Sequence, residues 1–127
     1  MGKKVSKRTL TKAEEEIMQY LWQLGEARVK EIVACYPTPR PAYNTVSTIV
    51  RILEKKGVVG HKGDSKPFVY YPLIDKDTYS RNVLQRLVEN YFSGSYTQLV
   101  SFFTRKNDLT VQELEDLLKE LKQEDHD

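Results

Sequence analysis

A five-residue segment with three prolines, Pro37-Thr38-Pro39-Arg40-Pro41, constrains the fold of this chain more than any other feature. Each proline lacks a backbone donor and disfavours helix at the preceding residue, so no helix passes through the segment. Apolar residues at helical spacing flank it on both sides. They predict one helix at about Lys30–Cys35 and another at about Ala42–Lys56, which ends at Gly57, with a stiff basic turn between them.

A further helix is predicted before this turn. Thr11 and Glu14 match a capping box, in which the Thr11 side chain accepts from the Glu14 amide and Glu14 reaches back. Acids in the first turn suit the helix dipole, so we interpret Glu14–Glu16 as a helix start and not as a catalytic pair. Gly25 ends the helix, and Trp22 is expected at the edge of its buried face. That face is predicted from Ala13, Ile17, Tyr20, Leu21 and Leu24.

A hairpin is predicted after the third helix. Val58–Lys62 and Pro67–Tyr71 have strand-like composition, and Gly63–Lys66 has the composition of a turn. A short extended stretch at Glu26–Val29 separates the first two helices. The order helix, short strand, helix, turn, helix and hairpin is that of the winged helix-turn-helix, a mostly α variant of the α+β class.

The helix at 42–56 has two unlike faces. Val46, Ile49, Val50 and Leu53 form its apolar stripe, while the opposite stripe holds no acid and mostly short polar side chains. Asn, Ser and Thr lower helix propensity, so an ordinary solvated face favours them less than Glu or Lys. Base edges in a DNA major groove suit short donors and acceptors together with one Arg. The base-reading and groove-lining candidates are Asn44, Thr45, Ser47, Thr48 and Arg51, and the alternative is a solvated helix face.

The charge distribution supports nucleic acid as a partner. The whole chain has a formal charge of +2, but residues 1–74 hold 13 Lys and Arg against seven acids, a balance of +6, and the remainder carries −4. Lys62 and Lys66 flank the hairpin turn, as expected for a wing on phosphates. For any single basic residue, a merely solvated side chain is the alternative. The DNA-backbone candidates are Arg40, Tyr43, Lys55, Lys62 and Lys66.

The rest of the chain is predicted to be helical. Helices are expected at about Lys76–Phe92, around Leu99–Phe103, and after a second capping box at Thr110–Glu113. So short a unit buries too little area to be stable alone and has more apolar positions than one core needs. We therefore expect residues 1–74 to bind DNA and residues 75–127 to dimerise, although packing on the first domain is an alternative. The dimerisation candidates are Leu84, Leu87, Val88, Tyr91, Leu99, Val100, Phe103, Leu114, Leu117, Leu118 and Leu121.

Other function classes find little support in the residues. The single cysteine, Cys35, excludes an intramolecular disulfide and fits a core position better than a redox sensor. His61 is a backbone-contact candidate or a solvated strand residue, and no zinc-ligand spacing, phosphate loop or nucleophile–base pattern is present. No apolar run approaches the roughly 20 residues that span a bilayer, and Met1–Lys12 lacks the apolar core of a signal peptide. We expect a cytoplasmic protein that is not an enzyme and needs no metal or cofactor. A winged-helix interaction module and a small-ligand-responsive regulator are the competing functions.

With these residues located, the sequence resembles the BlaI/MecI family of penicillinase repressors. The resemblance runs from about Leu10 to Leu121, and the third-helix and hairpin strings carry it most specifically. The matching strings are Thr11–Glu14, Ile17-Met18, Leu21-Trp22, Asn44–Ile49, Arg51–Gly57, His61-Lys62, Phe68–Tyr71, Leu99-Val100 and Asp108–Thr110 followed by Glu113-Leu114.

The resemblance implies a dimeric winged-helix repressor on an operator with two inverted half-sites. In this family the third helix enters the major groove, the wing contacts the backbone, and C-terminal helices form the dimer. A membrane sensor-protease detects a signal, typically a β-lactam, and the repressor is cleaved between an Asn and a Phe. That bond maps to Phe102–Phe103, where Phe102 stands in place of the Asn. Ser47 stands where family members often carry a basic side chain, so the operator sequence is not carried over.

Overall fold

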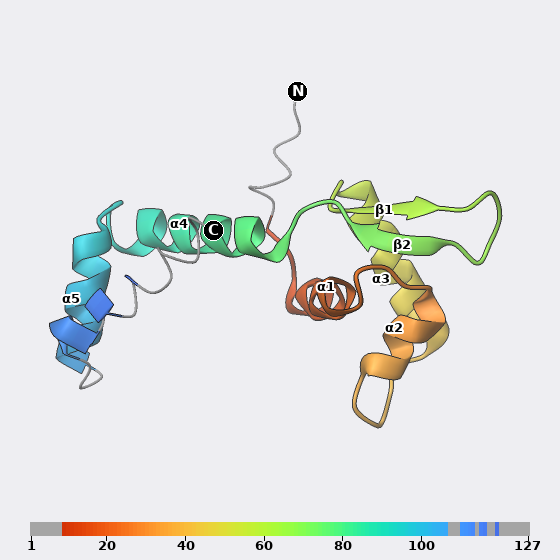
Figure 1. Cartoon of the computed structure of the whole chain (residues 1–127), viewed down its shortest axis with the longest axis horizontal. Coiled ribbons are helices and arrows are strands. Elements are labelled where there is room, and N and C mark those ends of the chain that lie inside the picture. Colours follow the sequence, from red (N-terminus) through yellow and green to blue (C-terminus); the bar gives the residue numbers. More distant parts are fainter. Residues whose placement is uncertain (1–8, 107–109, 114, 117–118, 120–127) are drawn as a thin grey trace. The chain divides into compact units, whose positions relative to one another are not determined.

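The computed structural model describes residues 9–106, 110–113, 115–116 and 119. The chain divides into two compact units, Met1–Val83 and Leu84–Asp127. The first unit contains α1 (Lys12–Leu24), α2 (Val29–Cys35), α3 (Tyr43–Lys55), β1 (Val59–Lys62), β2 (Val69–Pro72) and the start of α4 (Lys76–Tyr91) (Figure 1). This order confirms the predicted winged helix-turn-helix.

The capping box predicted for α1 is present. The Thr11 hydroxyl accepts from the Glu14 amide at 3.1 Å, and the Thr11 amide donates to the Glu14 carboxylate at 2.9 Å. Gly25 ends the helix with φ of 84°, a conformation that favours glycine. The buried face is rotated relative to the prediction, because Ala13 and Leu24 are exposed. The residues that α1 buries are Glu14, Ile17, Met18 and Leu21.

Glu14 occupies a buried position because the fold supplies partners for its charge. Glu14 is only 5% exposed, and its carboxylate accepts from the Lys56 ammonium at 2.7 Å. Burial alone raises the pKa of this carboxyl, but the hydrogen bonds from Lys56 and Thr11 outweigh it, so the pKa lies below its ordinary value. A residue that we interpreted only as a helix start therefore also links α1 to the end of α3.

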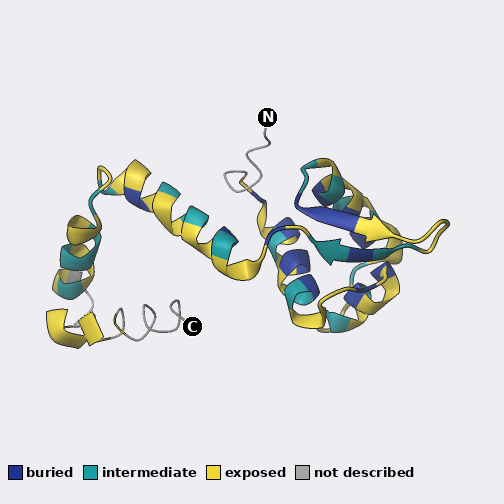
Figure 2. Cartoon of the chain, turned by 45° about the horizontal axis from the view of Figure 1, so that its top comes forward, coloured by how far each residue is buried: buried dark blue, intermediate teal, exposed yellow. Residues whose placement is uncertain are grey.

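One apolar core joins the three helices and the hairpin. α1, α2 and α3 contact one another, and the hairpin contacts α1 and α3. Figure 2 shows the buried residues concentrated in these elements, whereas α4 and α5 (Tyr96–Lys106) are mostly exposed or half-buried. The fully buried side chains at the centre of this core are Ile17, Met18, Leu21, Ile32, Val46, Val50 and Leu53.

The hairpin is extended by one residue of the α1–α2 connection. β1 and β2 pair antiparallel, with His61 opposite Tyr70. On the other edge of β2, the Ala27 amide donates to the Tyr70 carbonyl at 2.9 Å, and the Tyr70 amide donates to the Ala27 carbonyl at 2.8 Å. The extended stretch predicted at residues 26–29 is thus a bridge that fixes the base of the wing to the helices.

The first turns of α4 belong to the first unit. The Trp22 indole donates to the Ile74 carbonyl at 2.8 Å, and the Tyr79 hydroxyl donates to Glu15 at 2.6 Å. The rings of Trp22 and Tyr79 are 5.8 Å apart, and Tyr79 is only 6% exposed. Trp22 thus packs at the edge of the α1 face, as predicted, and attaches the start of α4 there.

The second unit contains the rest of α4 and α5. Val88 is 1% exposed, and the Phe92 and Phe102 rings pack edge to face at 5.6 Å. The capping box predicted at Thr110 is present, since its hydroxyl accepts from the Glu113 amide at 3.0 Å and its own amide donates to Glu113 at 3.0 Å. Four of the dimerisation candidates, Leu114, Leu117, Leu118 and Leu121, lie outside the described residues.

Candidate nucleic-acid interface

α3 has the two faces that its sequence predicts. Val46, Val50 and Leu53 are fully buried. The residues of the other face are open to solvent, apart from the half-buried Ser47. The part of this polar side that does not face the wing is open to a partner molecule. The exposed residues on that side are Asn44, Thr45, Thr48, Arg51 and Lys55.

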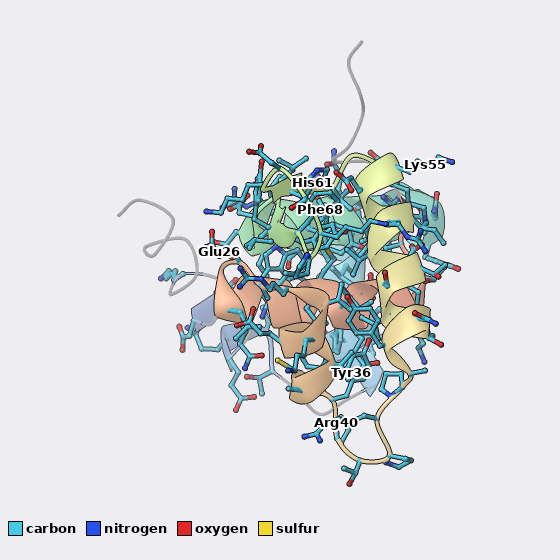
Figure 3. All side chains as sticks on the ribbon, turned by 90° about the vertical axis from the view of Figure 1, so that its right-hand side faces the viewer. Glu26, Tyr36, Arg40, Lys55, His61 and Phe68 are labelled. Carbon is cyan, nitrogen blue, oxygen red and sulfur yellow. The ribbon has the colours of Figure 1, made fainter. Side chains whose placement is uncertain are left out.

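Arg40, which the sequence predicts to contact the DNA backbone, stabilises the turn before α3. The Arg40 guanidinium donates to the Tyr36 carbonyl at 3.1 Å and to the Ala34 carbonyl at 3.3 Å. Figure 3 labels Tyr36 at the end of α2 and Arg40 in the turn that follows. These bonds occupy carbonyls that the C-terminus of α2 leaves without helical partners. Burial, assisted by the charge of Glu16, raises the pKa of Tyr36 to about 12, so this phenol stays neutral beside the turn.

A groove of about 590 Å³ lies between α3 and the wing. It brings together candidates that are far apart in the sequence, since Asn44, Ser47 and Arg51 contribute from α3 and Lys66 from the wing turn. Aromatic side chains form part of its wall. The remaining lining residues are Val29, Tyr43, Pro67, Phe68 and Tyr70.

Arg51 lies along α3 with most of its donors available. Its Nε donates to the Ser47 carbonyl at 3.4 Å and its Nη2 to the Thr48 hydroxyl at 3.3 Å. Both bonds are long, and a guanidinium has five N–H donors. The arrangement holds the side chain on the polar face. The remaining N–H donors of the guanidinium are available for a bidentate acceptor such as guanine or phosphate.

The wing is attached to the end of α3 through His61. The His61 Nδ1 pairs with the Glu54 carboxylate, and the imidazole stacks on the Phe68 ring with centroids 4.1 Å apart. Figure 3 labels His61 and Phe68 together on the hairpin. From the sequence, His61 was either a DNA-backbone contact or a solvated strand residue. In the structure its partner within the chain is Glu54. Helical spacing gave no signal for this pair.

Lys62 has an acidic partner within the protein. Its ammonium lies 2.7 Å from the Glu26 carboxylate, and both side chains remain more than half exposed, at 59% and 52%. Lys55 and Lys66 are also exposed, and neither forms an ion pair with any residue that the structure describes. Tyr43 is 49% exposed at the first position of α3.

Ile52 is a residue of this face that the sequence analysis missed. It is 40% exposed, although it is large and apolar, and it lies on α3 beside Thr48 and Lys55. The signal for it was present, because Ile52 falls outside the stripe formed by Val46, Val50 and Leu53.

Two features are absent from the described part of the chain. No group of three His, Cys, Asp or Glu residues there is arranged to hold a metal ion. Within the same residues, no helix is both long enough and apolar enough to cross a membrane.

The fold and this face define a winged helix-turn-helix protein with a polar third helix and a basic wing. Comparison with known proteins then identifies the family. The family model described as "Penicillinase repressor" matches residues 10–123, so the chain belongs to the penicillinase repressor family. The family is one of repressors, regulatory and not catalytic.

The relatives that the chain matches are similar to it over most of their length. The methicillin resistance regulatory protein MecI of Mammaliicoccus sciuri is 28% identical over 109 residues, which cover 85% of this chain and 89% of that protein. MecI of Staphylococcus aureus strain N315 matches with the same identity and coverage. The penicillinase repressor of Bacillus licheniformis is 24% identical over 115 residues, or 90% of each chain.

Proposed function

We propose that the protein is a transcriptional repressor that binds a double-stranded DNA operator with inverted half-sites as a homodimer, in the cytoplasm. One observation carries the proposal: the α3 residues Asn44, Ser47 and Arg51 line one groove together with the wing residue Lys66. Membership in a family of repressors supports it.

In this proposal α3 enters the major groove and reads base edges. Arg51 pairs with guanine, and Asn44 pairs with adenine, because these side chains match the donor and acceptor patterns of those bases. Thr45, Ser47 and Thr48 line the DNA major groove and supply single hydrogen bonds. A bidentate pair contributes about 1–3 kcal/mol of discrimination against a wrong base.

The wing and the ends of α3 bind phosphates. Lys62 and Lys66 extend from the hairpin, while Tyr43 and Lys55 lie at the first and last positions of α3. These contacts set the position of α3 on the duplex but carry no sequence information. Arg40 acts mainly through the turn that it stabilises and adds positive charge beside α3.

We further propose that residues 1–74 read DNA and residues 75–127 join the two protomers. Leu84, Leu87 and Tyr91 are spaced three and four along α4 and are 45%, 39% and 77% exposed. An apolar stripe of this kind favours a protein partner. Leu99 and Val100 are half-buried on α5, Phe103 is 42% exposed, and Val88 supports the stripe from inside the unit.

The names of the relatives support a proposal for the genes that the protein controls. Two of them are named for methicillin resistance and penicillinase, so we propose that this protein represses genes of β-lactam resistance. A membrane sensor-protease releases it by cleavage at Phe102–Phe103. This bond lies in α5, where both side chains are about 40% exposed, at 41% and 42%.

A binding titration on promoter and random DNA tests the proposal. We expect Arg51→Ala to lower affinity for the promoter site by about 1–3 kcal/mol and for random DNA far less. Arg105→Ala is the matched control, because Arg105 is exposed on α5 and lies outside the α3 face. Equal loss on both DNAs would contradict base reading by Arg51, and no binding to either would refute the function.

A further inference from the structure

The exposed side of α3 carries two lengthwise strips of different chemistry. Asn44, Ser47 and Arg51 form the first strip and line the groove shared with the wing. Thr45, Thr48 and Ile52 have the same three-and-four spacing, are all exposed, and do not belong to that lining. Residues at this spacing lie above one another on a helix. The second strip therefore runs beside the first along α3.

The second strip presents methyl groups. Thr48 is exposed, and beside the hydroxyl that accepts from Arg51 at 3.3 Å its side chain carries a methyl group that an apolar partner can contact. Ile52 is wholly apolar and 40% exposed, and it lines a shallow depression together with Thr48, Arg51, Glu54 and Lys55. A β-branched residue is a weaker helix former than Lys or Glu and gains nothing from water at this position.

We propose that Ile52, with Thr48 and Thr45, reads thymine methyl groups in the major groove. Among the four bases only thymine presents a methyl group there, and apolar side chains contact it. Arg51 and Lys55 flank the strip with positive charge, while the Glu54 carboxylate of the same depression is paired with His61. This charge suits a phosphate-lined groove better than an apolar protein surface. This inference rests on the proposed DNA binding and adds to it a requirement for A·T pairs on the Ile52 side of α3.

Single-methyl replacement in the operator tests the inference. Each thymine of the protected promoter site is replaced in turn by deoxyuridine, which removes the methyl group and keeps every hydrogen-bonding atom. We expect wild-type affinity to fall about threefold to fivefold at one or more thymines in each half-site, the loss for one buried methyl group. Ile52→Ala should bind the thymine operator with a similar loss and should no longer distinguish thymine from deoxyuridine at that position.

Controls separate this effect from a general loss of stability. Leu24→Ala removes an apolar side chain that is 46% exposed on α1, and it should keep the full sensitivity to deoxyuridine. Ile52→Thr keeps β-branching and serves as a second variant, and circular dichroism melts check that each variant folds.

Two outcomes would overturn the inference. One is a wild-type protein that protects its site and is indifferent to deoxyuridine at every thymine. The other is an Ile52→Ala protein with unchanged sensitivity at all of them. In both cases DNA binding itself would stand, whereas a protein that binds no promoter DNA would refute the proposed function together with the inference.

Discussion

At the residue scale, Glu14 shows how one side chain serves both local and tertiary structure. It caps α1 through Thr11, and it also receives the Lys56 ammonium from the residue after α3. The side chains of Glu14 and Lys56 are 7% and 26% exposed, so their pairing is more shielded than a surface ion pair. The bond connects the start of α1 to the end of the helix that we propose reads DNA.

Glu14→Gln should lower the free energy of unfolding by about 1–2 kcal/mol at pH 7. A glutamine retains the capping geometry, so the loss measures the charged bond to Lys56. Urea titrations provide the measurement, and Glu16→Gln is the matched control because Glu16 is exposed and bonds only Tyr20 among the described residues. An equal effect of both substitutions would contradict the role of the Lys56 pair.

The same pair predicts the pH dependence of this difference. The pKa of Glu14 is lower in the folded chain than its ordinary value of 4.5. A depressed carboxyl pKa contributes stability that is complete above the unfolded pKa and disappears as the pH falls through the folded pKa. The stability gap between wild type and Glu14→Gln should therefore be constant from pH 6 to 7 and should shrink as the pH falls below 4.5 and through the lower pKa of the folded chain. A gap that persists at low pH would contradict the charged pair.

At the element scale, the wing is held from three sides. Ala27 pairs with β2, His61 pairs with Glu54 of α3, and Lys62 pairs with Glu26. Burial, assisted by the Glu54 charge, raises the pKa of Tyr70 despite the opposing influence of Arg51, so this phenol is neutral where the wing meets α3. These contacts set the spacing between the wing and α3 before any partner binds.

Glu26→Gln should strengthen DNA binding about twofold to fivefold at roughly 100 mM salt, because Lys62 is then free for a phosphate. Stability should change by less than about 0.5 kcal/mol, since both partners are exposed. Fluorescence anisotropy titrations give the affinities. The gain should disappear when Lys62→Ala is already present. A gain of the same size in the Lys62→Ala variant would show a general effect of charge. It would contradict a competition between Glu26 and phosphate for Lys62.

The sequence predicts the elements of this fold better than their tertiary contacts. Helix periodicity, capping residues and the proline turn act over a few residues, so the three helices and the hairpin could be located within one or two positions. The pairs Glu14–Lys56 and Glu26–Lys62 join residues distant in the chain. No local pattern encodes them, and for the same reason the buried face of α1 was placed too far toward Ala13 and Leu24. Ile52 was not predicted because it belongs neither to the buried apolar stripe of α3 nor to its hydrogen-bonding side chains.

At the scale of the whole molecule, the proposal assigns DNA reading and pairing to different parts of one chain. Residues 1–74 carry a net charge of +6, which favours binding to phosphates. Residues 75–127 carry −4, so the phosphates should repel them. Two copies joined through the second part would present two α3 helices to one duplex. Affinity for an operator then depends on the dimer as much as on any base contact.

Leu87→Asp should shift the protein toward monomer, because it places a charge in the middle of the exposed stripe formed by Leu84, Leu87 and Tyr91. Sedimentation velocity measures the oligomeric state. Gln85→Asp adds the same charge at an exposed position of α4 outside that stripe and should leave the dimer intact. A dimer unaffected by Leu87→Asp would place the interface elsewhere.

The dimer also predicts a steep response to salt. If two protomers together neutralise about 6–10 phosphates, affinity should fall about 10³–10⁵-fold between 50 and 200 mM salt. Leu87→Asp should show roughly half the slope, since a monomer makes half of the contacts. An affinity that does not change with salt would exclude the basic wing and α3 as a phosphate-binding surface.

DNase footprinting over the promoter of the protein's own gene tests the central claim most directly. The account predicts two protected half-sites related as an inverted repeat, with centres separated by whole turns of the duplex, or about 10–10.5 base pairs per turn. Arg51→Ala should remove this protection at protein concentrations where Arg105→Ala retains it. Absence of a protected site, or protection that Arg51→Ala leaves unchanged, would contradict an operator-binding repressor that reads DNA through α3.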